Sequence, residues 1–425
     1  MLINICFLVG NMLKEITEEY LGALNRISII EREAKLPSGS DIKAIVGVRR
    51  VGKTVLMLQR VRELLEKGEN AVYISFDEPE IRKLNHRELA EEVRREFPSG
   101  NVYLFLDEVQ EWEEWDARIR WLHDVGDFDI YISGSSSTLL SSEIPSRLRG
   151  RYISRVILPF SFREVSSQDT KTFRNRGKIR KVLDDYLRWG GFPEVWTFKS
   201  REKIISIVET VFYRDIIKRF KIRDIKEFED FFYYVLSLYS SYFTYRSLQR
   251  ALASWIKLSV KTVMNYLKYM ESSMLIYTIP TFSPSQREII RRPKKLYIVD
   301  HGLANLFFRG MDMGRRIENV VFLELLRRKL YRNPLLKIFY YSGPEGEVDF
   351  VLVEGNKVIE LIQVTVEVTP ANYKREVEGL IKVGKKLKCN NLTLVTLERS
   401  DVDGVKVIPL WEFLLSSQES LLREL

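Results

Sequence analysis

The clearest chemistry in the sequence lies in the loop GVRRVGKT, which runs from Gly47 to Thr54. A loop of the form GxxxxGK[ST] wraps its backbone N–H groups around a β-phosphate, because glycine permits the close approach and the backbone angles required. Lys53 would reach the β- and γ-phosphates, and the Thr54 hydroxyl would ligate Mg²⁺. We therefore predict ATP and Mg²⁺ as ligands. The predicted nucleotide-binding residues are Gly47, Val48, Arg49, Arg50, Val51, Gly52, Lys53, Thr54 and Val55.

A second candidate group is the acidic pair Asp107 and Glu108, which follows the apolar run VYLFL at 102–106. Asp107 would hold the hydrated Mg²⁺, and Glu108 would orient and polarise the attacking water beside the γ-phosphate. An isolated Asp-Glu pair is more often a surface turn. A phosphate loop upstream in the same domain favours the catalytic interpretation, so we predict ATP hydrolysis.

Two further catalytic roles are assigned by position. The run DIYIS at 129–133 ends in Gly134 and a series of serines, where Ser135 is our candidate for sensing the γ-phosphate, although serine-rich turns are usually only turns. The loop SRLRGR at 146–151 carries three arginines, any of which suits a finger donated to a neighbouring subunit's γ-phosphate. We rank Arg151 first, before Arg147 and Arg149. The alternative is a solvated basic loop.

These residues require a sheet that brings strand ends together. The runs AVYISF at 71–76, DIYIS and YISRVIL at 152–158 each follow a helical stretch, which predicts repeated βα units and a parallel sheet. The apolar run before Gly47 and the helical pattern after Thr54 place the phosphate loop between a strand and a helix. A chain of 425 residues with 45% hydrophobic and 29% charged residues is expected to fold into two or three domains.

The overall composition narrows the expected partners and environment. A formal charge of +9 fits a phosphate-rich partner such as DNA, or simply a solvated basic surface. The initial apolar run is short and lacks a basic flank, so we expect no secretory signal and no membrane span. Cys6 and Cys389 have no neighbouring partner that would make a metal or redox motif. A cytoplasmic protein is the simplest expectation.

Several motifs together resemble a known family. GVRRVGKT, LFLDEVQEWEEW, ISGSSSTLL, RGRYISRVILPFSFREV and YLRWGGFPEV, in this order, are similar to the archaeal and bacterial AAA+-type ATPases that carry a DUF4143-type C-terminal domain. The resemblance covers nearly the whole chain after about residue 15. It implies an α/β fold with a P-loop core of strand order 5-1-4-3-2, ATP and Mg²⁺ as ligands, and a helical region followed by a winged helix.

The middle of the chain is predicted to be helical and then to form a winged helix. Helical patterns at 179–189 and 203–220, separated by a Gly-Gly-Phe-Pro break, would form a lid. Segments 244–253 and 259–270 have the length and apolar spacing of a helix-turn-helix. The polar face of the second helix, which would meet a DNA groove, carries Lys261, Thr262, Asn265 and Lys268. The alternative is a winged helix used only for packing or protein contacts. A nucleic-acid contact is favoured by basic residues in the expected wing loop, namely Arg287, Arg291, Arg292, Lys294 and Lys295.

The C-terminal pattern of helix, strand, hairpin, helix and strands resembles the restriction-endonuclease-like fold of two-metal nucleases. Glu318 and Asp349 stand at two of that family's metal-binding positions, but the E-x-K triplet is replaced by Gln363-Val364-Thr365. Gln363 can offer a carbonyl oxygen, whereas threonine cannot replace the ammonium. Glu360 is expected to point to the opposite face of the sheet. We predict a degenerate nuclease fold that is used for binding or assembly and does not cleave nucleic acid.

The resulting domain prediction is an ATPase core at 1–160, a helical lid at 161–230, a winged helix at 231–312 and a restriction-endonuclease-like domain at 313–425. The favoured function is an ATPase coupled to DNA binding or remodelling, as in a translocase or helicase. The alternative is a nucleotide-dependent switch or scaffold that acts on a protein partner. An arginine finger in trans would require a homo-oligomer such as a hexamer.

Overall fold

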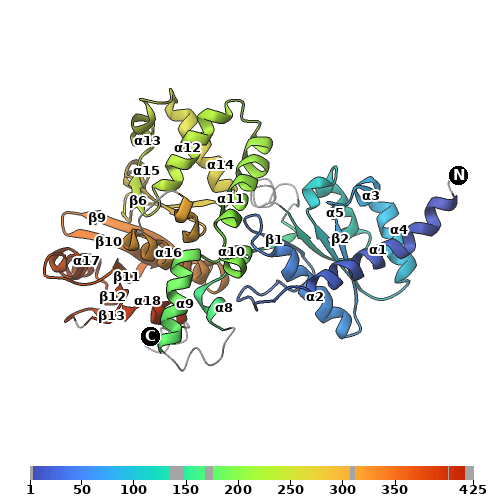
Figure 1. Ribbon diagram of the computed structural model, residues 1–425, viewed down its shortest axis with the longest axis horizontal. Helices are drawn as coiled ribbons and strands as arrows, with labels where there is room; N and C mark the ends of the chain where they lie inside the picture. Colours follow the sequence, from blue (N-terminus) through green and yellow to red (C-terminus); the bar gives the residue numbers. More distant parts are fainter. Residues whose placement is uncertain are drawn as a thin grey trace. The chain divides into compact units, whose positions relative to one another are not determined.

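The computed structural model describes residues 3–134, 148, 150–167, 176–306, 312–400 and 402–416 (Figure 1). The chain divides into two compact units, Met1–Ile157 and Leu158–Leu425. This division lies close to the predicted end of the ATPase core at residue 160. The predicted divisions at 230/231 and 312/313 stay predictions.

The first unit is built on a five-stranded sheet of order β2-β3-β4-β1-β5, in which every pair of neighbouring strands is parallel. Its strands are β1 (Ile42–Val46), β2 (Asn70–Ser75), β3 (Val102–Asp107), β4 (Asp129–Ser133) and β5 (Tyr152–Val156). The central strands are buried on both faces, as expected for strands covered by helices on both sides. The predicted order 5-1-4-3-2 is therefore confirmed.

Helices precede and connect these strands along the chain, and they bury apolar side chains against the sheet. They are α1 (Ile3–Leu24), α2 (Lys53–Glu66), α3 (Pro79–Lys83), α4 (His86–Glu96), the 3-10 turn η1 (Val109–Glu111) and α5 (Trp115–Asp124). Asn85 caps α4 by accepting from the backbone N–H of Glu88, whose side chain in turn accepts from the Asn85 N–H. No described helix has both the length and the apolar character that a membrane span would need.

The second unit begins with a run of helices and helical turns. These are α8 (Phe162–Ser166), α9 (Arg176–Trp189), α10 (Pro193–Phe198), α11 (Arg201–Thr210), the π-helical η2 (Val211–Lys218), α12 (Ile225–Ser237), α13 (Tyr245–Leu252), α14 (Val260–Ser272), α15 (Gln286–Arg291) and η3 (His301–Leu306). A three-stranded antiparallel sheet of order β6-β8-β7 accompanies them, formed by β6 (Ser241–Phe243), β7 (Ile276–Ile279) and β8 (Lys294–Ile298). Ser259 and Thr244 cap α14 and α13, so the two predicted helices begin where their capping residues indicate.

The rest of the second unit is a mixed five-stranded sheet of order β13-β12-β11-β10-β9 with helices packed against it. Its elements are α16 (Met313–Tyr331), β9 (Lys337–Gly343), β10 (Gly346–Glu354), β11 (Lys357–Thr365), η4 (Lys374–Glu378), α17 (Gly379–Leu387), β12 (Leu392–Thr396), β13 (Lys406–Pro409) and α18 (Leu410–Leu415). β9, β10 and β11 are antiparallel neighbours, whereas β12 and β13 continue in parallel. The element order matches the predicted helix, strand, hairpin, helix and strands.

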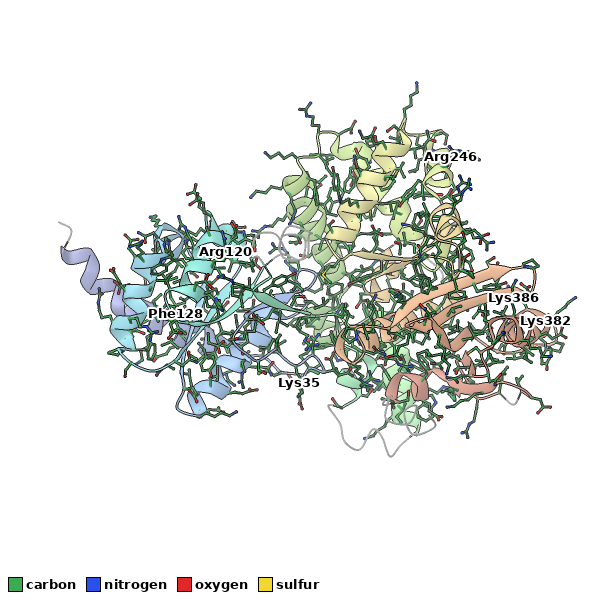
Figure 2. The ribbon with its side chains drawn as sticks, turned by 180° about the vertical axis from the view of Figure 1, so that it is seen from behind. Lys35, Arg120, Phe128, Arg246, Lys382 and Lys386 are labelled. Atoms are coloured by element: carbon green, nitrogen blue, oxygen red, sulfur yellow. The ribbon has the colours of Figure 1, made fainter. Side chains whose placement is uncertain are left out.

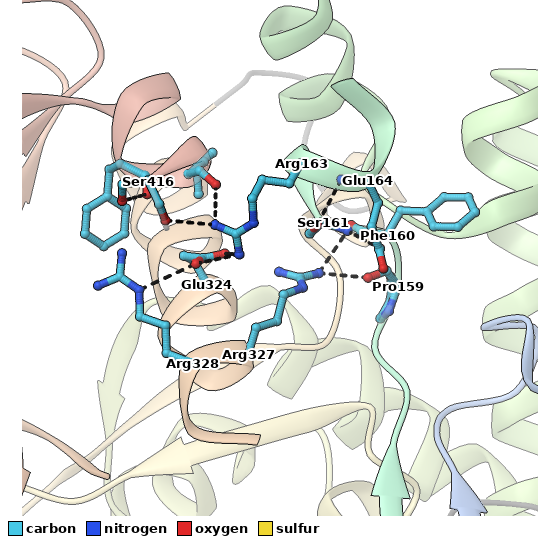
Figure 3. Close-up of polar contacts among 11 residues, drawn as sticks. Pro159, Phe160, Ser161, Arg163, Glu164, Glu324, Arg327, Arg328 and Ser416 are labelled. Carbon is cyan, nitrogen blue, oxygen red and sulfur yellow. Dashed lines mark hydrogen bonds and ion pairs between the residues drawn. The ribbon is translucent and has the colours of Figure 1, made fainter. Parts of the chain in front are cut away.

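Buried polar side chains of α16 form hydrogen bonds and ion pairs with the first segment of the second unit (Figure 3). Arg163 of α8 donates to both carboxylate oxygens of Glu324, at 2.9 and 3.0 Å. Arg163 also donates to the carbonyl oxygens of Leu414 and Ser416 at the end of α18. Arg327 donates to the carbonyl of Pro159 at 2.8 Å. The segment entering the unit is thus tied to α16 by charged groups away from water.

Candidate active site

The phosphate loop lies between β1 and α2, as its sequence predicts. Arg50 and Gly52 have left-handed backbone angles, with φ of 62° and 95°. A Cβ atom added at Gly47 would lie 2.4 Å from the carbonyl oxygen of Ile157. Glycine is therefore required at position 47 by this close approach, and the N-terminus of α2 presents its free N–H groups and positive dipole end at the loop.

Lys53, the first residue of α2, is held inside the loop. Its side chain is buried, and its Nζ donates to the carbonyl oxygens of Gly47 at 3.1 Å and Val48 at 3.4 Å. These contacts keep the ammonium at the loop that would surround the phosphates. A bound phosphate chain would offer it a stronger, charged acceptor in the same place.

Asp107, the last residue of β3, is the centre of a hydrogen-bond network. It is buried, and its Oδ2 accepts from the Thr54 hydroxyl at 2.6 Å and from the Tyr73 hydroxyl at 2.7 Å. Its Oδ1 accepts from the Ser133 hydroxyl and from the backbone N–H of Glu108. The hydroxyl and carboxylate that a P-loop Mg²⁺ requires therefore already lie together, and both offer the oxygen atoms that Mg²⁺ prefers.

Glu108 has the environment of a proton acceptor. It sits at a left-handed turn with φ of 53°, and its Oε2 accepts from the side-chain amide of Gln110. Burial raises the pKa of Glu108; the Asp107 carboxylate adds to the rise, and the Lys53 ammonium opposes it. A carboxylate with a raised pKa takes a proton from water more readily at neutral pH.

Two residues of this network were missed by the sequence analysis. Ser133 ends β4 and is fully buried, and Tyr73 lies on β2, which neighbours β3. Ser133 could have been predicted, because it is a polar residue at the carboxyl end of a strand that was expected to lie near Asp107. Nothing local marked Tyr73, because tyrosine is common in strands.

The remaining catalytic candidates are placed differently. Ser135, Arg147 and Arg149 lie outside the described residues. Arg151 is half exposed at the amino end of β5 and forms an ion pair with Asp124. Asp107 and the phosphate loop lie at the opposite, carboxyl edge of this parallel sheet, so Arg151 is not part of the phosphate site of the same chain.

The predicted DNA-contacting residues are mostly solvent-facing. Lys261, Asn265 and Lys268 are exposed on α14. Thr262 is half buried, and both its backbone N–H and its hydroxyl are engaged with Ser259 at the helix cap. The helix thus offers two ammonium groups and one amide on its open face.

The expectation for the wing loop is wrong for one residue and weakened for another. Lys295 lies in β8 and is buried, so it cannot contact DNA. Arg292 donates to the carbonyl of Ser342 on β9 at 2.9 Å. The period of the strand explains the error, because Lys294 and Lys295 point to opposite faces. Arg287 and Arg291 remain exposed on α15.

The nuclease-like positions come together around this same lysine. Nζ of Lys295 lies 2.7 Å from Oε1 of Glu318 and 2.8 Å from Oδ1 of Asp349. Burial opposes the charge on Lys295, but the two carboxylates outweigh it and raise the pKa of Lys295 above its ordinary value. An ammonium group from β8 therefore lies between the two predicted metal-site carboxylates.

Gln363 is engaged on both sides of its amide. Its Oε1 accepts from the backbone N–H of Asp349 at 3.1 Å, and its Nε2 donates to Glu376 at 2.7 Å. One of the two lone pairs of this carbonyl oxygen is therefore already engaged, and its use as a metal ligand stays a prediction. Glu360 instead accepts from the Thr393 hydroxyl. Within the described residues, no group of three or more His, Cys, Asp or Glu side chains is arranged to hold a metal ion.

Comparison with known proteins agrees with the P-loop geometry. A family model described as "AAA domain" matches residues 39–166, and one described as "Domain of unknown function (DUF8612)" matches residues 180–312. The first match identifies a P-loop nucleotide-binding domain of the AAA class. The second bears a different name from the DUF4143 type that the sequence resemblance implied.

Relatives span nearly the whole chain. The uncharacterized protein MJ1544 of Methanocaldococcus jannaschii is 31% identical over 95% of this chain and 95% of its own length. An uncharacterized protein of Haemophilus influenzae is 27% identical over 92% of this chain and 98% of its own length. Among solved structures, the Walker-type ATPase PABY2304 of Pyrococcus abyssi has a TM-score of 0.41 and 15% identity, covering 62% of this chain and 90% of that one.

Proposed function

We propose that this protein is a Mg²⁺-dependent ATPase. The chain belongs to the same family as protein MJ1544 of Methanocaldococcus jannaschii. The observation that carries the proposal is the convergence of Lys53, Thr54 and Asp107 on one loop, with Glu108 beside them. These are the positive charge, the hydroxyl, the carboxylate and the proton acceptor that phosphoryl transfer to water requires.

Each residue then has a defined task. The loop N–H groups and the Lys53 ammonium hold the β- and γ-phosphates. Thr54 and Asp107 would hold Mg²⁺, which neutralises phosphate charge when bound. Tyr73 and Ser133 orient the Asp107 carboxylate by donating to its two oxygens. Glu108 aligns a water and accepts its proton.

ATP hydrolysis by the wild type and by Lys53→Ala tests this proposal. The variant loses the buried ammonium at the phosphates, so we expect turnover in the wild type and none above background in the variant. Lys67→Ala, which changes an exposed lysine at the end of α2, serves as the matched control and should retain the wild-type rate. Equal turnover in the wild type and Lys53→Ala would place the activity elsewhere.

The favoured role of this ATPase is to act on DNA. Helices α12, α13 and α14 with the sheet β6-β8-β7 have the element order of a winged helix, and Lys261 and Lys268 stand on the open face of α14. The net charge of +9 favours a polyanion. The second candidate is a switch or scaffold for a protein partner. This role is favoured by the C-terminal sheet, whose order resembles that of a restriction endonuclease. Its predicted metal-site carboxylates, Glu318 and Asp349, are engaged with Lys295 instead of a metal.

Removing charge from α14 distinguishes the two roles. Lys261→Ala with Lys268→Ala should weaken binding to duplex DNA and lower the slope of log K against log salt by about 2, since about one counterion is released per phosphate contact. Fluorescence anisotropy at several salt concentrations measures this slope. The control is Lys382→Ala on α17 (Figure 2), which removes one exposed lysine paired with Glu378. If the double variant and the control bind DNA with the same affinity and salt dependence, α14 does not contact DNA. That result would favour the role with a protein partner.

Arg151 is our candidate for an arginine finger given to a neighbouring subunit. Its half-exposed position at the amino end of β5 suits a contact outside its own phosphate site. Such a finger needs a homo-oligomer, for example a hexamer, and this assembly is part of the proposal. Sedimentation with and without ATP tests it, and a monomer under both conditions would argue against the finger.

A further inference from the structure

A buried cation joins three elements of the second unit. Lys295 of β8, Glu318 of α16 and Asp349 of β10 form what we call the lysine–carboxylate triad. One ammonium contacts both acids, at 2.7 and 2.8 Å, and the side chain of Lys295 is 4% exposed. The two acids occupy the positions at which the resembling nucleases hold divalent metal ions, so the group between them decides what the domain can do.

The oxygens of this site do not fit a divalent metal. Mg²⁺ requires nearly octahedral oxygen ligation at about 2.1 Å, usually with several waters. Here Glu318 Oε1 also accepts from the Tyr297 hydroxyl at 2.7 Å, and Asp349 Oδ2 accepts from the backbone N–H of Val364 at 3.0 Å. The Gln363 carbonyl oxygen is likewise taken by the N–H of Asp349. Hydrogen-bond donors therefore stand where a metal would need free ligands and water.

The same region ties the sheet β6-β8-β7 to the C-terminal sheet by polar contacts. Asn319 of α16 accepts from the N–H of Ile298 and donates to its carbonyl, at 2.9 and 3.0 Å. After β7, Phe282 donates its N–H to the carbonyl of Tyr340 on β9, and Tyr340 donates back to the carbonyl of Pro280. Lys295 is therefore one of several links between the two sheets, and its contacts with Glu318 and Asp349 are ion pairs.

We propose that the ammonium of Lys295 permanently occupies the cation position of this carboxylate site. It thereby holds the sheet β6-β8-β7 against the C-terminal sheet without a metal ion. This inference goes beyond the proposed ATPase. The C-terminal sheet then has a fixed architecture that needs no metal ion. The positive charge between its carboxylates is the structural Lys295 ammonium from β8, where a nuclease would hold catalytic metal ions. Removing the ammonium leaves two carboxylates facing each other in a buried place, which then require protons or a divalent cation.

The first test is thermal melting of the full chain with EDTA or with millimolar Mn²⁺ as the probe. The wild type and the control Lys294→Met, which changes the neighbouring lysine on the other face of β8, should melt alike and should show no Mn²⁺ response that depends on Asp349. Lys295→Met should melt several degrees lower in EDTA and regain part of that loss with Mn²⁺. Adding Asp349→Asn to Lys295→Met should abolish the gain from Mn²⁺.

The second test does not require the Lys295 variant to fold. Mn²⁺ binding to the wild type and to Asp349→Asn, followed by electron paramagnetic resonance without nucleotide, should give the same stoichiometry. One bound Mn²⁺ that disappears in Asp349→Asn would overturn the proposal, because the native site would then take a metal. A Lys295→Met protein as stable as the wild type in EDTA would overturn it as well.

Discussion

Replacing Glu108 by glutamine is expected to lower kcat for ATP hydrolysis by about 10²- to 10⁴-fold, the range that a positioned proton acceptor contributes. The amide has nearly the shape of the carboxylate but cannot take a proton from the attacking water. Lys53, Thr54 and Asp107 are unchanged, so ATP binding should stay close to the wild-type value. Single-turnover hydrolysis and binding of a fluorescent ATP analogue, measured on the same protein, separate the two effects.

The pH profile gives a second readout of the same residue. Because the pKa of Glu108 is raised, mainly by burial, its active carboxylate form is lost as the pH falls through a value above that of an ordinary glutamate. The wild-type rate should therefore decline on the acid side, and Glu108→Gln should lack this decline. Glu111→Gln in the following turn is the control and should keep both the rate and the profile. A Glu108→Gln rate within a factor of a few of the wild type would remove Glu108 from the mechanism.

Replacing Glu324 by alanine is expected to destabilise the second unit by about 3–5 kcal/mol, the usual effect of removing one partner from a buried ion pair. The Glu324 side chain is 1% exposed and accepts from Arg163 and Arg328 (Figure 3). Its loss leaves the Arg163 guanidinium with two backbone carbonyl acceptors and the Arg328 guanidinium against the Phe413 ring without its carboxylate partner. Arg163 also fastens α8 to the end of α18, so the change should loosen the start of the unit.

Chemical denaturation and amide hydrogen exchange measure this effect. The free energy of unfolding should fall, and protection should be lost along α8 and α16. Glu354→Ala, at the exposed end of β10, removes the same charge without a buried partner and should change stability by well under 1 kcal/mol. If the two variants are equally stable, the cluster does not hold the unit together.

The nucleotide domain could be predicted well because its signals are local. A strand and a helix directly flank the glycine-bounded loop Gly47–Thr54, and the apolar run at 102–106 is followed at once by Asp107. The βα repetition predicted a parallel sheet, and the family resemblance supplied the order that the structure confirms. What stayed hidden was the side-chain network, because Tyr73 and Ser133 meet Asp107 only after three strands align.

The second unit shows where such reasoning fails. Lys295 stands in the run RRPKKL, which resembles a solvated basic loop, and its partners Glu318 and Asp349 are distant in sequence. A buried lysine has no local signature apart from its place in the strand period. The three-residue strand β6 was missed for a related reason, since so short a strand is defined by its pairing with β8 rather than by its own pattern.

Steady-state ATP hydrolysis with Mg²⁺ tests the proposed DNA-dependent ATPase most directly. It is measured with and without duplex DNA on the wild type and on the Lys261→Ala, Lys268→Ala double variant. We expect the wild type to hydrolyse ATP at a rate that DNA raises several-fold, and we expect high salt to remove this acceleration. The double variant should keep the basal rate but show little acceleration. A protein that hydrolyses no ATP under any of these conditions would contradict the central claim. A DNA-independent rate would leave the ATPase standing and turn the search to a protein partner.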